Sequence, residues 1–164
     1  PYSLTPETYG DFLIRLFDLW FEDRMAGRFV FNRYFENLVG LMLGRPNELC
    51  GMGACAPQLV VEADGSAYPC DFYMLDDYRL GNFQTDTVPD MARVWDRSEF
   101  ARESVLGLEA CRSCPYGGLC RGGCRRDRQG VELHRVGRNY FCPAYRRFFA
   151  HAIPKLQLML GMRG

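Results

Sequence analysis

The sequence has no apolar run of the roughly 18 residues that a transmembrane helix requires, so neither a membrane span nor a membrane partner is predicted. It has no net charge, because 20 Lys and Arg residues balance 20 Asp and Glu residues. This balance removes the long-range field that would favour nucleic acid as a partner. The first residues also lack the basic and apolar segments of a secretory signal, which predicts a cytoplasmic protein. Pro1 in place of a methionine indicates a fragment of a longer chain, so the missing signal carries little weight.

The first part of the chain has no cysteine and is predicted to be mainly helical. Residues 5–22 predict an amphipathic helix with Thr5 as its cap and Pro6 at its first position. Residues 28–31 predict a short strand, and residues 32–43 predict a second helix. Four aromatic residues of the first helix are expected to lie in the protein core, namely Tyr9, Phe12, Phe17 and Trp20.

A domain boundary is expected near residue 45, where a helix-stopping segment is followed by the first cysteine. Residues 58–70 then predict a β-hairpin, because two apolar runs flank the Asp64-Gly65 turn pair. Cys70 lies at the exit of this hairpin.

The remainder of the chain predicts short helices, loops and one longer helix. Residues 90–107 predict one or two short helices, and the glycine-rich region of residues 111–138 predicts loops. The last helix should begin at Pro143 and bend or end at Pro154. The side chains expected to reach a core from residues 90–107 are Met91, Val94, Trp95 and Phe100.

Eight cysteines lie after the boundary, and they could form disulfides, zinc sites or iron-sulfur clusters. Disulfides are the least favoured, because such frameworks replace a core in small secreted chains, whereas 48% of this sequence is hydrophobic. Zinc is the second possibility, since Cys111-x2-Cys114 is a usual zinc knuckle. Zinc ribbons normally pair two such knuckles, however, and only one is present here.

Iron-sulfur clusters fit the irregular spacing better, because a cubane is wider than one zinc ion and accepts thiolates from distant loops. Eight cysteines supply the ligands of two 4Fe-4S clusters. In "CRSCPYGGLCRGGC", the glycines allow the backbone to pass close to the sulfurs. The last cysteine of such a run ligates the other cluster in two-cluster ferredoxins. Zinc stays open as the alternative metal.

The spacing of all eight cysteines resembles that of the SPASM domain, the C-terminal auxiliary-cluster domain of many radical S-adenosylmethionine enzymes. The stretches "CGMGACAPQLVVEADGSAYPCDFY" and "RLGNF" are most similar to anaerobic sulfatase-maturating enzymes. This resemblance implies an α+β fold, in which a β-hairpin, loops around two metal clusters and flanking helices form a small cysteine-rich domain. It also implies three parts: residues 1–45 as the end of a partial (β/α) barrel, residues 46–142 as the SPASM domain and residues 143–164 as a C-terminal helix.

The resemblance also implies ligands and partners. Cluster I would be held by Cys50, Cys55, Cys70 and Cys124. Cluster II would be held by Cys111, Cys114, Cys120 and Cys142. The implied role is electron transfer and peptide binding during oxidation of a sulfatase Cys or Ser to formylglycine, with ferredoxin or flavodoxin as external electron carrier.

One departure from the radical enzymes limits what the chain can do alone. Their activating cluster needs a C-x3-C-x2-C run, and the only C-x3-C here, Cys120 to Cys124, has Asp127 at the third position. S-adenosylmethionine and a third 4Fe-4S cluster are therefore expected only in the full-length enzyme. The radical-generating barrel is then a missing partner, and the chain by itself is not catalytically competent.

Asp71 is the one candidate catalytic residue, because it follows the predicted ligand Cys70 and matches the general base of the maturase family. A carboxylate beside an electron-accepting cluster suits coupled removal of a proton and an electron. Without the resemblance, the simpler interpretation is a solvated or turn-capping aspartate. The pattern alone does not separate these roles.

Two other residue types accompany the cysteines. Seven arginines lie among or next to the cysteines of the second half of the cysteine region. They either offset the negative charge of a thiolate-ligated cluster or form a solvated basic loop. They are Arg112, Arg121, Arg125, Arg126, Arg128, Arg135 and Arg138. His134 and His151 are not needed as ligands and are expected in packing or surface roles.

Two alternative functions remain open at this point. The first is a zinc-stabilised module that binds peptides and has no enzymatic role. The second is the SPASM domain of an enzyme that installs thioether or other cross-links in a different ribosomal peptide.

Overall fold

The computed structural model describes residues 3–128 and 137–161, which form helices and one small antiparallel sheet. The helices are α1 (Pro6–Met25), α2 (Arg33–Met42), α3 (Val88–Arg97), α4 (Phe100–Glu103), α5 (Glu109–Arg112), α6 (Gly117–Cys120) and α7 (Cys142–Met159). The strands are β1 (Val60–Val61), β2 (Ser66–Tyr68) and β3 (Gly81–Asn82), and Asp76–Tyr78 and Arg125–Arg128 form 3-10 turns. This confirms the α+β class.

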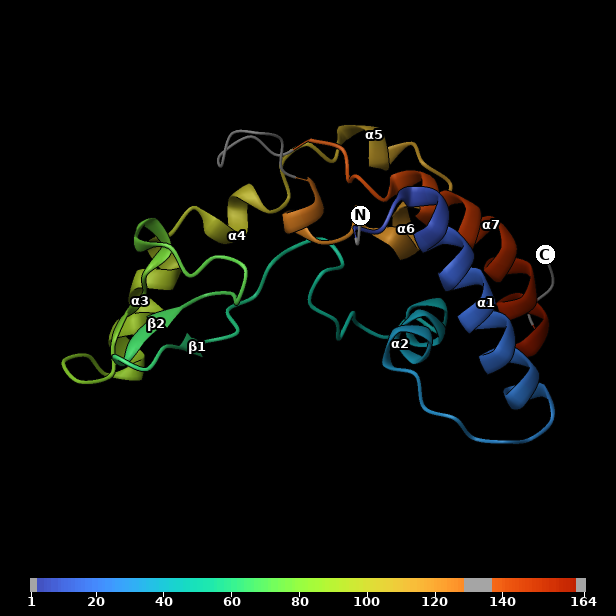
Figure 1. Ribbon diagram of the computed structural model, residues 1–164, viewed down its shortest axis with the longest axis horizontal. Helices are drawn as coiled ribbons and strands as arrows, with labels where there is room; N and C mark the ends of the chain where they lie inside the picture. The colour runs from blue at the N-terminus through green and yellow to red at the C-terminus, as the bar shows by residue number, and fades with distance from the viewer. Residues whose placement is uncertain (1–2, 129–136, 162–164) are drawn as a thin grey trace.

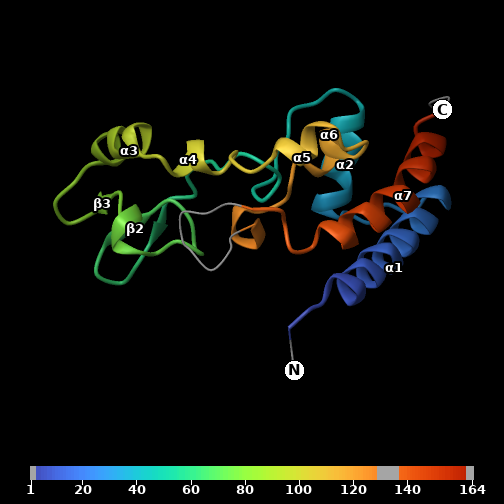
Figure 2. The ribbon, with the colours of Figure 1, turned by 90° about the horizontal axis from the view of Figure 1, so that it is seen from above.

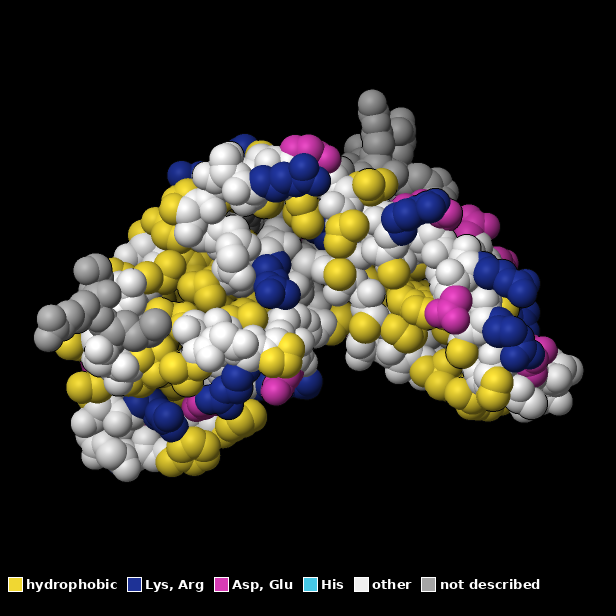
Figure 3. Space-filling model, turned by 180° about the vertical axis from the view of Figure 1, so that it is seen from behind, with side chains coloured by type: hydrophobic (Ala, Val, Ile, Leu, Met, Phe, Trp, Pro, Cys, Tyr) yellow, Lys and Arg dark blue, Asp and Glu magenta, His cyan; other side chains and the backbone are white. Residues whose placement is uncertain are grey.

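The molecule is an arch, with the sheet and α3 at one end and α1, α2 and α7 at the other (Figure 1). Helices α4, α5 and α6 connect the two ends. The arch is hollowed between its ends, and apolar side chains are exposed around the hollow (Figure 3). Within the described ranges, none of the helices combines the length and the apolar character that crossing a bilayer would require.

Side-chain caps fix the start of both N-terminal helices where the sequence predicts them. Thr5 and Thr8 form a reciprocal capping box at the start of α1. The Asn32 side-chain oxygen accepts hydrogen bonds from the backbone N–H groups of Tyr34 and Phe35 at the start of α2. These caps satisfy backbone donors that the first helical turn leaves without partners.

The predicted strand at residues 28–31 is wrong, because this segment is an irregular link between α1 and α2. No described strand lies beside it, and a strand needs a neighbour to pair its backbone groups. Its Phe29 and Phe31 side chains are consequently 72% and 65% exposed.

The main core lies where α1 and α7 run side by side and α2 crosses them (Figure 2). The rings of Phe17, Phe35 and Phe148 are fully buried, and their centroids lie 5.3 to 6.0 Å apart. The predicted core positions of Phe17 and Trp20 are therefore confirmed, because α2 and α7 bury both side chains. Phe12, predicted as core, is 55% exposed.

The predicted hairpin is confirmed, with β1 and β2 antiparallel and Val60 opposite Tyr68. Gly65 takes a φ of 84° in the turn, a value that glycine adopts without strain. The strand β3 was not predicted, because it has only two residues and shows no periodicity. It pairs with β2, and its neighbour Leu80 donates a backbone hydrogen bond to Ala67.

The prediction of one or two short helices within residues 90–107 is confirmed, since α3 and α4 are found there, with α3 beginning two residues earlier at Val88. Met91 and Phe100 are buried as predicted, whereas Val94 is 43% exposed and its core assignment is wrong. The region of residues 111–138, predicted as loops, contains α5, α6 and a 3-10 turn. These elements are shorter than the window in which a helical period can be recognised.

Helix α7 begins at Cys142, one residue before the predicted start, and continues through Pro154 to Met159. Of the two outcomes predicted at Pro154, a bend or an end of the helix, the end is wrong. Proline removes one backbone hydrogen bond, but Phe148, Phe149 and Leu156 are fully buried against the core on both sides of it. Packing of this face holds the helix beyond the proline.

Candidate metal centres

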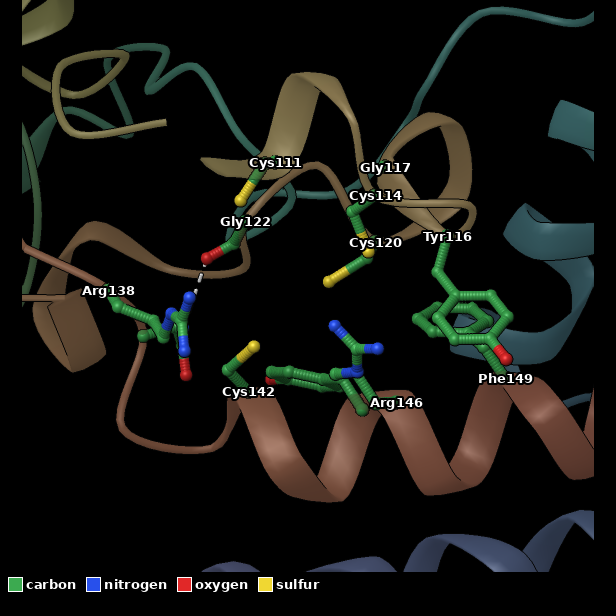
Figure 4. Close-up of a pocket in the computed structure, with 12 residues that line it drawn as sticks. Cys111, Cys114, Tyr116, Gly117, Cys120, Gly122, Arg138, Cys142, Arg146 and Phe149 are labelled. Atoms are coloured by element: carbon green, nitrogen blue, oxygen red, sulfur yellow. Dashed lines mark hydrogen bonds between the residues drawn. The ribbon is translucent and has the colours of Figure 1, made fainter. Parts of the chain in front are cut away.

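Four of the eight free cysteines line a single cavity between α5, α6 and the start of α7. They are the four predicted for cluster II, namely Cys111, Cys114, Cys120 and Cys142. Cys111, Cys120 and Cys142 belong to α5, α6 and α7, and Cys114 lies in the link between α5 and α6. Their side chains surround a common space (Figure 4). Aromatic rings close the cavity on the side of α7, where Tyr145 and Phe149 line it.

The thiols of this group interact electrostatically. Burial and, to a smaller extent, the neighbouring Cys111, Cys142 and Cys114 together raise the pKa of Cys120 to about 11, while a backbone hydrogen bond from Gly122 acts in the opposite direction. Burial, Cys142 and Cys114 likewise raise the pKa of Cys111. Thiols with a raised pKa are protonated near neutral pH, so a metal must displace their protons when it binds.

Glycine allows α6 to approach the first ligand of this group closely. A Cβ atom added at Gly117 would overlap the backbone carbonyl oxygen of Cys111, which cannot move away as a flexible side chain could. A Cβ atom added at the adjacent Gly118 would have no neighbour within 4 Å. The position of Cys111 relative to α6 therefore depends on Gly117 and not on Gly118.

We expect Gly117→Ala to lower the free energy of unfolding by about 1 to 3 kcal/mol, the usual cost of overpacking. Gly118→Ala is the matched control, because alanine favours the helix and should raise stability by up to about 1 kcal/mol. Urea denaturation of the two variants and the parent checks this prediction. Equal effects of the two substitutions would contradict it.

The four cysteines predicted for cluster I come from the loop before β1, the exit of the hairpin and the turn after α6, and their charges act on one another's pKa. Burial raises the pKa of Cys55 and Cys124, and the negative charge of Cys50 contributes to both shifts. Burial raises the pKa of Cys70 to about 11, and Asp71 and Cys50 act in the same direction. These interactions indicate that the four thiols of this set lie near one another.

The arrangement suits a cluster better than a single ion. Among the described residues, which include all eight cysteines, no three His, Cys, Asp or Glu side chains lie close enough to hold one metal ion. A zinc site needs all its sulfurs about 2.3 Å from one point. In a cubane each iron takes its own thiolate, so four thiols around a shared space fit its donor set.

The arginines divide into two kinds that the sequence does not distinguish. Arg125 and Arg128 are 0% and 1% exposed, so the interpretation as a solvated basic loop is wrong for these two. The exposed ones are Arg112, Arg121, Arg126 and Arg138. Arg135 and His134 lie outside the described residues. No sequence signal marks the two buried arginines, because their burial depends on α4 packing over them.

Asp71 and His151 occupy different surroundings. The Asp71 side chain is exposed, and its Oδ1 atom lies 3.4 Å from the Cys70 Sγ atom, which donates a hydrogen bond to it. The carboxylate is thus directly beside a predicted cluster ligand.

The His151 Nε2 atom lies 2.6 Å from Asp18 Oδ1, so His151 links α7 to α1, as expected of a packing residue.

Comparison with known proteins identifies relatives over nearly the whole chain. Residues 50–115 match the SPASM family, described as an iron-sulfur cluster-binding domain. The chain is 46% identical over 156 residues to the cysteine-type anaerobic sulfatase-maturating enzyme of Clostridium perfringens strain 13, a match that covers 94% of this chain and 42% of that protein. It is 29% identical over 161 residues to the serine-type enzyme of Bacteroides thetaiotaomicron, covering 96% of this chain and 38% of that protein.

A solved structure has the same fold. The structure of native anSMEcpe with bound AdoMet and the Kp18Cys peptide superposes with a TM-score of 0.89 at 43% sequence identity. The superposition covers 98% of this chain and 45% of that one. The chain therefore spans less than half the length of the relatives that it matches.

Proposed function

Residues 50–115 belong to the SPASM family of iron-sulfur cluster-binding domains, and from this premise we propose that the chain is the auxiliary-cluster part of a radical S-adenosylmethionine enzyme that matures sulfatases. The observation that carries the proposal is the meeting of four free thiols around a single cavity, in a chain with four more free cysteines. Similarity to both cysteine-type and serine-type sulfatase-maturating enzymes supports the choice of reaction.

Each set of thiols would hold one 4Fe-4S cluster. Cys50, Cys55, Cys70 and Cys124 would hold cluster I, and Cys111, Cys114, Cys120 and Cys142 would hold cluster II. When bound, such clusters supply one-electron acceptors at low potential. The protein excludes water from these ligands unequally, since Cys70 is buried whereas Cys50 is exposed. The more exposed ligands leave a route for an external electron carrier such as ferredoxin or flavodoxin.

In the complete enzyme, Asp71 would act as the general base. The substrate Cys or Ser side chain loses a hydrogen atom from carbon to the radical, a proton from its thiol or hydroxyl group, and one electron. Asp71 Oδ1 accepts a hydrogen bond from Cys70 and is exposed, so its carboxylate is open to a peptide while touching a cluster ligand. The proton and the electron would thus leave at neighbouring positions. S-adenosylmethionine and the cluster that cleaves it would belong to another part of that enzyme.

Anaerobic reconstitution with iron and sulfide tests the metal chemistry. We expect brown protein with broad visible absorption and a paramagnetic signal after reduction, because 4Fe-4S clusters accept one electron each. Colourless protein that binds zinc and takes up no sulfide would overturn the proposal in favour of a zinc-stabilised module.

A further inference from the structure

Two arginine side chains are buried beside the cysteines predicted for cluster I, where a guanidinium group is costly unless its charge is compensated. Arg125 directly follows Cys124 and Arg128 lies one helical turn further on, at 0% and 1% exposure. Arginine stays protonated in such sites, so both positions carry a positive charge in the interior.

Arg125 has its own compensation within the protein. Its Nη2 atom donates hydrogen bonds to Glu103 Oε2 at 2.6 Å and to the Tyr78 hydroxyl group at 3.0 Å. The guanidinium carbon lies 4.5 Å from the ring centroid of Phe100 and 5.0 Å from that of Tyr73. A carboxylate and aromatic faces thus balance this charge locally.

Arg128 has hydrogen bonds but no such counter-charge. Its guanidinium group donates to the backbone carbonyl oxygens of Leu106 at 3.2 Å, of Gly53 at 3.5 Å and of Ser104. Its buried Nε atom has no hydrogen-bond partner, and no described carboxylate lies within salt-bridge distance of it. No described carboxylate therefore balances the positive charge of Arg128.

The contacts of Arg128 place it against cluster I ligands. Gly53 lies in the loop between Cys50 and Cys55, and the Ser104 hydroxyl group accepts a hydrogen bond from the Cys55 backbone N–H at 2.8 Å. Burial lowers the pKa of Arg128, while the negative charges of the Cys55, Cys124 and, to a smaller extent, Cys111 thiolates oppose that shift. The groups that would balance Arg128 are thus thiolates, chiefly those of Cys55 and Cys124 in the cluster I set.

We propose that Arg128 supplies a fixed positive charge beside the thiolate-ligated cluster I. This charge would stabilise the reduced form of the cluster and raise its reduction potential. The inference rests on the proposed function, because it requires a cluster at this site. A 4Fe-4S cluster with four thiolates carries net negative charge that increases on reduction, so a buried cation favours the reduced state. The charge of Arg125 is already paired with Glu103 within the chain.

Redox titration of the anaerobically reconstituted chain, followed by electron paramagnetic resonance, tests the proposal. Arg128→Gln should make reduction of one cluster about tenfold less favourable, a shift of about 59 mV to more negative potential for one electron. Arg128→Lys keeps the charge and should shift it less than about threefold. Arg126→Gln is the matched control, because Arg126 belongs to the same turn but is exposed, and it should leave the potential unchanged.

The outcomes separate this inference from the proposed function. An unchanged reduction potential in Arg128→Gln, together with a lower free energy of unfolding, would overturn the inference. Arg128 would then have only a structural role, as a hydrogen-bond donor to three backbone carbonyl groups. If Arg128→Gln loses its cluster, a parent-like potential in Arg128→Lys supports the inference, and a tenfold shift in that variant overturns it. A chain that binds no iron and sulfide at all would instead overturn the proposed function, and the inference with it.

Discussion

Replacing Cys142 with alanine is expected to remove one cluster from the chain and to leave the other intact. Cys142 lies at the start of α7 and lines the same cavity as Cys111, Cys114 and Cys120. Removal of one of four thiolates leaves one iron without a protein ligand. Iron and acid-labile sulfide should therefore each fall from about eight to about four per chain, since each cluster contains four of both.

The matched control for this prediction is Cys124→Ala. Cys124 is close to Cys120 in sequence but is absent from the cavity lining, and its pKa is raised by burial and by Cys55 and Cys50 of the other group. Cys124→Ala should therefore remove the other cluster. The double variant with Cys142→Ala and Cys124→Ala should then contain neither cluster. If the double variant kept about four irons, both cysteines would serve the same cluster, and the crossed assignment would be contradicted.

Asp71→Asn is expected to lower formylglycine formation by about 10²- to 10⁴-fold in a full-length maturase that contains this segment, the usual contribution of a general base. The substitution removes the proton acceptor but keeps the shape of the side chain. It is also expected to leave cluster content unchanged, because Asp71 is adjacent to a ligand without being one. Conversion of a cysteine-containing sulfatase peptide, followed by mass spectrometry, provides the measurement.

Asp77→Asn serves as the control for Asp71, because both carboxylates are exposed and lie on the same connection between β2 and β3. It should leave the rate within about twofold of the parent rate, since surface substitutions away from a site have small effects. A rate loss below tenfold for Asp71→Asn with clusters intact would contradict the role of Asp71 as base.

The parts of the fold that the sequence predicted are those with strong local signals. Caps and apolar spacing indicate α1 and α2, and the Asp64-Gly65 pair indicates the hairpin, because these features act within a few residues of each other. The strand β3 and the helices α5 and α6 are too short to produce a period. The false strand at residues 28–31 has the right residue types but no neighbour.

The candidate site was predictable in its ligands but not in its surroundings. Spacing alone favoured iron-sulfur clusters, and the family resemblance supplied the division of the cysteines into two sets. Burial of Arg125 and Arg128 could not be predicted, because it depends on contacts with Phe100, Ser104 and other residues more than twenty positions away in sequence. Contacts of this kind are set by the tertiary fold, and the local composition around them predicts an exposed basic loop.

The most direct test of the account is the amount of iron, acid-labile sulfide and zinc per chain after purification and reconstitution without oxygen. Two 4Fe-4S clusters predict about eight irons and about eight sulfides, with negligible zinc. About two zinc ions per chain, with no sulfide taken up on reconstitution, would contradict the account. The two sets of thiols would then hold structural metal, and neither would take part in electron transfer.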